Sequence, residues 1–184
     1  EFAPFEFKSL VNGKDTLVGA DIELAKAIGE KLGVKVEFSV MSFDNVLANV
    51  QSGKADIAIA GISVTDERKK VYDFSDSYYT SENVVIVKKD KVNDYTSTDS
   101  LAKQTVGTQK GSVQETVAKK QISKASVVSL TSNGEMINEL KSGQLQAVVL
   151  EKAIAEGYIA QNDDLTLANF NLKSDGTDAY AVAT

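Results

Sequence analysis

Apolar and polar residues in the first third of the chain follow the period of a helix and then that of a strand. Over residues 21–32 the apolar positions share one helical face, formed by Ile22, Ala25, Ile28 and Leu32. Gly33 comes next and is suited to end a helix in the left-handed conformation. Residues 34–40 then indicate a strand.

A second helix and a second strand follow directly. Residues 45–52 indicate a short helix closed by Gly53. Residues 55–60 are so uniformly apolar that they predict a buried strand without a solvated face. Strand, helix and strand in this order are typical of an α/β sheet.

The same pattern recurs in the second half of the chain. Residues 40–61 align without a gap to residues 130–151, an offset of 90, and Ser-Gly falls at the same place in both segments. At this offset Asp21, near the start of the first helix, corresponds to Gly111, where another helix is expected. A period near 90 is too long for a solenoid repeat, so it predicts two similar α/β lobes. Chance similarity of two helix–strand pairs is the alternative.

The lobes are expected to meet where the β-branched segment 83–90 leads into a polar stretch. The predicted fold class is α/β, with mixed sheets in two lobes joined by a β-strand hinge and a ligand cleft between them. Ligands in such folds bind beyond the carboxyl ends of strands and at helix N-termini. We assign residues 1–86 and 181–184 to lobe 1, residues 90–178 to lobe 2, and hinge strands to about 84–89 and 179–182.

Composition narrows the function classes. The chain has 184 residues, a net charge of −6, and neither cysteine nor histidine. The acidic balance argues against nucleic acid as a partner, and no apolar run reaches the ~18–20 residues that span a membrane. Without cysteine or histidine there is no thiol nucleophile, no Ser/His triad and no zinc site built from those ligands. We predict no catalytic residues, no metal and no cofactor.

Arg68 is the only arginine among the 20 basic residues of the chain. It follows the apolar segment 55–60 and stands three residues after Thr65, a natural helix N-cap. The helix dipole disfavours a cation so close to a helix N-terminus, whereas a guanidinium pairs bidentately with a carboxylate. We expect Arg68 to bind an anionic group of a ligand. The alternative is a surface ion pair with Asp66, Glu67 or Asp73.

The second lobe offers a partner for the same anion. The segment from Gln109 through Gly111 predicts a strand end, a turn and a helix start. Backbone amides of Ser112 and Val113 at this helix start would share the anion with Arg68. The alternative is an ordinary strand-to-helix turn.

Glu151 is the candidate residue for binding a cationic group of a ligand. It ends the apolar run 147–150, and a carboxylate there must be solvated or paired. The backbone carbonyl of Gly61 and the hydroxyl of Ser63 would complete a site suited to a zwitterion. The alternative is that Glu151 caps the helix expected over residues 152–158.

Two aromatic residues are candidates for contact with a ligand side chain. Phe2 lies beside the only proline of the chain, and Phe43 lies in a loop before a helix. At the repeat offset Phe43 corresponds to Asn133, so this aromatic is specific to lobe 1. Aromatic pairs can flank an aliphatic or cationic side chain. Phe5 and Phe7 are assigned to the core.

Taken together, several segments resemble the amino-acid-binding members of the type 2 periplasmic-type solute-binding proteins of ABC importers (bacterial extracellular solute-binding protein family 3). The resemblance covers essentially the whole chain and is carried by residues 3–7, 19–25, 56–69, 73–79 and 109–115.

The resemblance implies roles for the same residues. The arginine matching Arg68 pairs with the α-carboxylate, helped by the amides of the second-lobe turn, and the acid matching Glu151 receives the α-ammonium with the groups at Gly61 and Ser63. Aromatics matching Phe2 and Phe43 flank the ligand side chain. Two departures stand out: the family's acid is usually Asp, one methylene shorter than Glu151, and Val113 stands where Thr is frequent.

The resemblance further implies a monomeric binding protein rather than an enzyme. It would capture a free L-amino acid, polar or basic, such as glutamine, arginine or lysine, and deliver it to an ABC permease. It would act outside the cytoplasm, in the periplasm or as a lipoprotein on the outer face of a membrane, with its signal peptide removed. The alternatives are a ligand-binding domain of a membrane sensor, or a dehydratase that uses Glu151 as its acid or base.

Members of this family carry a strand before the position of Glu1 and helices after that of Thr184. Lobe 1 is therefore expected to expose apolar surface.

Overall fold

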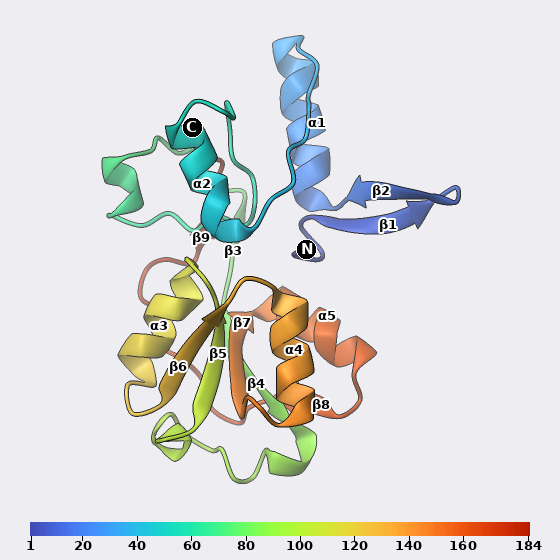
Figure 1. Ribbon diagram of the computed structural model, residues 1–184. Helices are drawn as coiled ribbons and strands as arrows, with labels where there is room; N and C mark the ends of the chain where they lie inside the picture. The colour runs from blue at the N-terminus through green and yellow to red at the C-terminus, as the bar shows by residue number, and fades with distance from the viewer. The chain divides into compact units, whose positions relative to one another are not determined.

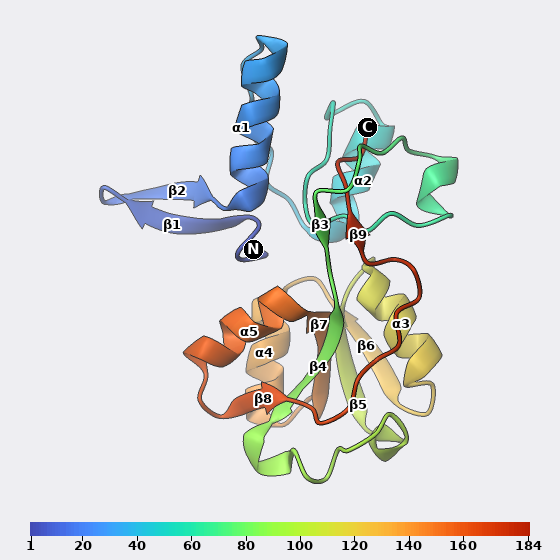
Figure 2. The same cartoon turned by 180° about the vertical axis from the view of Figure 1, so that it is seen from behind.

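The computed structural model describes all residues, 1–184, and divides into two units (Figure 1). Unit 1 comprises Glu1–Tyr79 and Ala179–Thr184, and unit 2 comprises Thr80–Asp178. The chain enters unit 2 at β3 (Tyr79–Thr80) and leaves it at β9 (Ala179–Tyr180), and these two short strands pair with each other (Figure 2). The predicted boundary at 86–90 lies beyond this point, because the segment assigned to the hinge is an interior strand of the unit 2 sheet.

Unit 2 is built on a mixed five-stranded sheet in the order β6-β5-β7-β4-β8. The three parallel strands are β5, β6 and β7, and β4 runs antiparallel between β7 and β8. Three helices, α3, α4 and α5, link or follow the parallel strands. The bounds are β4 Asn83–Lys88, β5 Thr105–Gln109, α3 Val113–Gln121, β6 Ser126–Leu130, α4 Asn133–Ser142, β7 Ala147–Glu151, α5 Lys152–Gln161 and β8 Leu165–Leu167. Two short 3₁₀ turns, Lys89–Lys91 and Asp99–Leu101, lie between β4 and β5.

The core of unit 2 lies on both faces of the sheet, because its strands carry apolar side chains on both faces. Val106 of β5 packs with Ala118 and Ile122 of α3. The next residue, Gly107, faces Met136 of α4 instead, since a Cβ there would lie 3.5 Å from the methionine Sδ. Successive residues of a strand point to opposite faces, so α3 and α4 cover opposite faces of the sheet.

Unit 1 is held by helices and by short pairings rather than by one continuous sheet. Its elements are the antiparallel hairpin β1 (Phe7–Val11) and β2 (Lys14–Val18), helices α1 (Ala20–Leu32) and α2 (Phe43–Gln51), and the 3₁₀ turn η1 (Arg68–Lys70). Its core gathers Ala58, Ala60, Ile62 and Ala183 under the apolar face of α2. Isolated bridges Ala58–Ala183 and Ser63–Tyr180 join the C-terminal residues to the middle of the unit.

Two predicted strands of unit 1 are wrong. Residues 34–40 are extended but form no strand, because no segment pairs with them, and Val34 and Val40 are exposed. Residues 55–60 are reduced to the single bridge at Ala58, and Ile59 is only half-buried. A strand needs a ladder of hydrogen bonds to a neighbour, which an apolar sequence alone does not supply.

The repeat at an offset of 90 is present in the local structure. α2 begins at Phe43 and α4 at Asn133, each directly after a serine N-cap. Gly53 and Gly143 both adopt the left-handed conformation after these helices, with φ of 72° and 83°. Equivalent amides then close the turn in both units: Lys54 N–H donates to the Asn49 carbonyl and Gln144 N–H to that of Glu139.

The large exposed apolar side chains all belong to unit 1, as expected, and are Leu10, Val11, Leu32, Val34, Phe38, Val40 and Val71. None of the helices combines the length and the apolar character required to cross a membrane.

Candidate functional site

Arg68 is positioned by the turn that follows the apolar segment. The Thr65 hydroxyl accepts a hydrogen bond from Arg68 N–H at 3.1 Å, but the N-cap residue of the 3₁₀ turn that begins at Arg68 is Glu67, not Thr65 as predicted. The guanidinium folds back so that Nη1 donates to the Ser63 carbonyl at 2.7 Å. Asp66, one of the surface acids considered for Arg68, pairs with Lys69 at 3.8 Å. The turn therefore directs the guanidinium towards Ser63.

Phe43 joins this group from α2. Its ring centroid lies 5.9 Å from Arg68 Cζ, a distance at which the ring face attracts a cation. Burial lowers the pKa of Arg68, because a charged group loses hydration there. A guanidinium titrates so far above neutrality that it keeps its charge. Unit 1 thus presents a desolvated, fixed cation beside an aromatic ring.

Gly61 lies where side chains crowd its backbone. Its φ is +57°, and a Cβ would lie 2.6 Å from Phe2 Cε1 and 3.1 Å from Tyr180 Cε2. Phe2 is buried beside Phe5, with the ring centroids 5.7 Å apart. Phe2 and Gly61 are therefore in contact, and Tyr180, which also bridges to Ser63, links them to the Arg68 turn.

Replacing Gly61 by alanine is expected to destabilise unit 1 more than the same change at Gly53. Both glycines have positive φ, so both pay the left-handed cost of an L-residue, about 1–2 kcal/mol. A Cβ at Gly53 meets nothing within 4 Å, whereas one at Gly61 collides with a buried ring. Denaturant unfolding should show a loss at least ~1 kcal/mol larger for Gly61→Ala. Equal losses would show that the Phe2 ring does not restrict this position.

An acidic cluster in unit 1 was not predicted from the sequence. Asp21, in the first turn of α1, is buried and accepts hydrogen bonds from Gly61 N–H at 3.1 Å and from the Tyr78 hydroxyl at 2.9 Å. Burial raises the pKa of Asp21, and these two bonds oppose the rise. The Asp21 carboxylate thereby fixes the amide N–H of Gly61, the residue whose carbonyl is a predicted ligand group.

Glu6 is the second acid of this cluster. Burial, and then the charge of Asp21, raise the pKa of Glu6 to about 8. Its Oε2 is buried without a hydrogen-bond partner. Because Asp21 receives two donors and Glu6 Oε2 none, the single negative charge of the pair resides on Asp21 at neutral pH.

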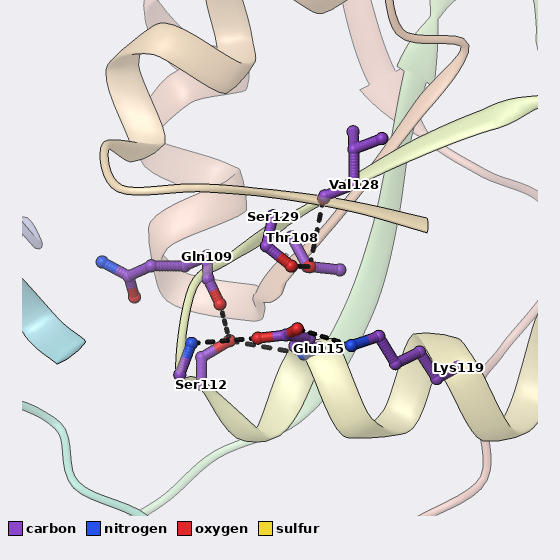
Figure 3. A network of polar contacts seen from close by, with 8 residues as sticks. Thr108, Gln109, Ser112, Glu115, Lys119, Val128 and Ser129 are labelled. Carbon is purple, nitrogen blue, oxygen red and sulfur yellow. Dashed lines mark hydrogen bonds and ion pairs between the residues drawn. The ribbon is translucent and has the colours of Figure 1, made fainter. Parts of the chain in front are cut away.

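In unit 2 the candidate residues Gln109, Gly111, Ser112 and Val113 form the turn between β5 and α3, and Figure 3 shows Gln109 and Ser112 in this turn. Ser112 is the N-cap of α3: its Oγ accepts from Glu115 N–H at 3.3 Å and donates to the Gln109 carbonyl at 2.6 Å. Gly111 has φ of +76°, and its N–H donates to Glu115 Oε2 at 3.0 Å. This is a capping box shifted by one residue, and it holds the turn rigidly.

The amide of Ser112 is already engaged in this turn, since it donates to the Gln109 carbonyl at 3.2 Å. Val113 is the first residue of α3, where backbone N–H groups have no intrahelical acceptor. Of the two amides expected to bind an anion, that of Val113 is therefore the better placed.

Glu151 is the buried N-cap of α5, which is the alternative that the sequence left open. Its Oε2 accepts from Ala153 N–H at 2.8 Å and from Ile154 N–H at 3.3 Å. The capping bonds hold the carboxylate in place at the end of β7.

Glu151 belongs to a larger polar group at the end of the sheet where the parallel strands terminate, which we call the polar edge. The parallel strands β5, β6 and β7 end there, and Asn83 of β4 is paired in register with Glu151. Asn83 Oδ1 accepts from Gln114 Nε2 at 2.7 Å. The buried polar side chains of unit 2 all lie at this edge, and they are Ser81, Asn83, Thr108, Ser112, Gln114, Asn133 and Glu151.

Within unit 1 the structure brings together five predicted residues, namely Phe2, Phe43, Gly61, Ser63 and Arg68. Within unit 2 it places the other five, Gln109, Gly111, Ser112, Val113 and Glu151, at the polar edge of the sheet. Phe5 is buried as predicted, while Phe7 is only half-buried. Asp21, Glu6, Tyr180 and Asn133 were missed as members of these groups.

The chain is similar to known binding proteins. The sequence model of the family "Bacterial extracellular solute-binding proteins, family 3" matches residues 1–125. The arginine-binding extracellular protein ArtP of Bacillus subtilis is 36% identical over 167 residues, which cover 90% of this chain and 63% of ArtP. A probable histidine-binding protein of Campylobacter jejuni is 31% identical over 182 residues, which cover 99% of this chain and 68% of that protein. The chain therefore spans about two thirds of these relatives.

Solved structures of similar proteins share the fold. The amino acid ABC transporter substrate-binding protein AbpA from Streptococcus pneumoniae, bound to L-arginine, matches with a TM-score of 0.95 and 55% identity, over 100% of this chain and 77% of that chain. An ancestral arginine-binding protein bound to arginine matches with a TM-score of 0.89 and 41% identity, over 100% of this chain and 80% of that chain.

Proposed function

Because the chain belongs to family 3 of the bacterial extracellular solute-binding proteins, we propose that it binds free L-arginine and delivers it to a membrane permease of an ABC importer. The similar proteins are substrate-binding transport proteins, not enzymes, and the family acts outside the cytoplasm. Arginine is favoured over the other predicted ligands, glutamine and lysine, because AbpA, at 55% identity, is bound to L-arginine.

The observation that carries the proposal is the single, desolvated guanidinium of Arg68 held against Ser63 and Phe43. In the proposed complex Arg68 binds the α-carboxylate bidentately, with Val113 N–H as a further donor. Ser112 N–H would also donate to the carboxylate once its hydrogen bond to the Gln109 carbonyl is broken. Charge and geometry both suit this role, since a guanidinium is a planar fork of donors and that of Arg68 is desolvated by burial.

The α-ammonium of the ligand is assigned to Glu151, with the Gly61 carbonyl and Ser63 as the other acceptors. The Glu151 carboxylate is held in place by its two capping bonds, and the Gly61 amide is held by Asp21. Phe2 and Phe43 would flank the aliphatic part of the ligand, while Gln109 and Gly111 shape the turn. Because these groups come from both units, ligand binding would stabilise one arrangement of the units over others.

A thermal-shift screen of the twenty amino acids tests the proposal. A ligand that binds only the folded protein raises its melting temperature, by the equivalent of ~2.7 kcal/mol at a hundredfold excess over Kd. We expect the largest shift with L-arginine and smaller shifts with lysine and glutamine. A screen in which arginine leaves the melting temperature unchanged would refute the assignment.

Replacing Glu151 by glutamine should weaken arginine binding at least tenfold, about 1.4 kcal/mol, because the ammonium loses an ionised partner. The glutamine oxygen can still accept the bonds from Ala153 and Ile154, so the folded state should be largely preserved. Calorimetric titration with 5-guanidinopentanoic acid, which lacks the ammonium, provides the comparison. Equal losses for both ligands would remove Glu151 from the ammonium site.

A further inference from the structure

Asn133 is a buried side chain whose hydrogen bonds are missing. Only 2% of the residue is exposed, and neither Oδ1 nor Nδ2 has a hydrogen-bond partner. A buried carboxamide without partners costs folding free energy, so its presence requires a reason. The other buried amides at this edge of unit 2, Asn83 and Gln114, bond to each other at 2.7 Å.

The position of Asn133 places its amide at the polar edge of the sheet. It is the first residue of α4, and the buried residues of that helix, Asn133, Met136, Ile137 and Leu140, follow the spacing of one sheet-facing stripe. α4 begins three residues after the end of β6, beside the ends of β5 and β7. The apolar members of the stripe cover the sheet, so Asn133 lies over the edge where Ser112 and Glu151 also lie.

The internal repeat gives Asn133 a second connection to ligand recognition. At the offset of 90 it corresponds to Phe43, and each is the first helical residue after a serine cap. Phe43 contacts Arg68, which the proposed function assigns to the ligand. Equivalent positions in the two units thus carry an aromatic ring in one and an unsatisfied amide in the other.

We propose that Asn133 is a specificity-determining residue whose Oδ1 accepts a hydrogen bond from the terminal guanidinium of the bound amino acid. This inference rests on the proposed function and assigns the side-chain end of the same ligand. A guanidinium carries five N–H donors, and a buried carbonyl oxygen without a partner is an acceptor that gains fully from one of them. An amino acid without a terminal donor would leave the amide unsatisfied and bind more weakly.

The test compares L-arginine with L-citrulline, which has the same length but a neutral ureido group, in calorimetric titrations of three proteins. Asn133→Asp keeps the shape and adds a negative charge at the acceptor, so the ratio of arginine to citrulline affinity should rise at least fivefold. Asn133→Leu removes the acceptor, so arginine affinity should fall at least tenfold. The control is Asn138→Asp, which adds the same charge at an exposed position of the same helix and should leave the ratio unchanged.

Thermal unfolding of the ligand-free protein distinguishes a role of Asn133 in ligand binding from a role in stabilising the fold. Removing an unsatisfied amide should not destabilise the protein, so Asn133→Leu should melt at or above the wild-type temperature. An unchanged arginine-to-citrulline ratio in Asn133→Asp and unchanged arginine affinity in Asn133→Leu would overturn the inference, whether a structural contact or a buried water satisfies the amide. Failure of the wild-type protein to bind arginine at all would instead overturn the proposed function.

Discussion

Replacing Arg68 by alanine is expected to weaken arginine binding by about 2–4 kcal/mol, a loss of roughly 30- to 1,000-fold in affinity. The change removes the only guanidinium of the protein and leaves the ligand carboxylate desolvated without its charged partner. Arg68→Lys should recover only part of the affinity, because an ammonium cannot form two parallel bonds to a carboxylate and also reach the Ser63 carbonyl. Calorimetric titration of the variants measures both losses.

Lys69→Ala is the matched control for Arg68. Lys69 is the adjacent residue in the same 3₁₀ turn, is exposed, and forms a surface pair with Asp66 at 3.8 Å. Exposed pairs of this kind contribute little, so affinity should remain within about twofold of wild type. If Arg68→Ala bound arginine as well as Lys69→Ala does, the guanidinium would have no place in the binding site.

The stability of unit 1 is expected to fall as pH rises from about 4.5 to 8. In the folded protein Glu6 holds its proton up to a pKa of about 8, whereas the unfolded chain releases it near the ordinary value of 4.5. Unfolding in this window therefore releases a proton, so the free energy of unfolding decreases with pH and levels off above about 8. The total loss is on the order of 3–5 kcal/mol.

Chemical denaturation between pH 5 and 9 measures this dependence, and Glu6→Gln provides the direct comparison. Glutamine mimics the protonated acid, so the variant should lose most of the pH dependence and be the more stable protein at pH 9. The control Glu37→Gln changes an exposed acid of the same unit and should retain the wild-type profile. A wild-type profile that rises between pH 5 and 8 would contradict the buried acidic pair of Glu6 and Asp21.

The sequence predicted best what is determined locally. The end of α1 at Gly33 and the left-handed turn at Gly53 after α2 each depend on residues within four positions, and both are present. The β4 and β7 strands were also predicted, because their continuous apolar runs suit the interior of a sheet. The predicted fold class of two α/β lobes agrees with the similar solved structures.

The sequence failed where a partner distant in the chain decides the outcome. Residues 34–40 have a strand-like composition, yet no segment lies beside them to complete a ladder. The segment predicted as the first hinge strand, about 84–89, is instead β4 of the unit 2 sheet, because an apolar run indicates that a strand forms but not which sheet contains it. Whether a strand forms depends on the apolar run itself, whereas the strand it pairs with depends on which other segments lie beside it in the fold.

In the candidate site, too, residues marked by local sequence features could be predicted, and residues whose contacts are distant in the chain could not. Arg68 could be singled out because it is unique in the sequence and stands against the helix dipole. The role of Asp21 could not, because an acid in the first turn of a helix needs no further reason, and its bonds to Gly61 and Tyr78 span 40 and 57 residues. The only sequence signal for Asn133 was its alignment with Phe43 across the repeat.

Titration of wild type and Arg68→Ala with L-arginine and with L-argininamide, in which the carboxylate is replaced by a neutral amide, tests the central claim most directly. The account predicts that wild type binds arginine at least thirtyfold more tightly than argininamide, about 2 kcal/mol, and that Arg68→Ala binds the two about equally. Retention of the wild-type preference by Arg68→Ala would show that another group receives the carboxylate and would contradict the account.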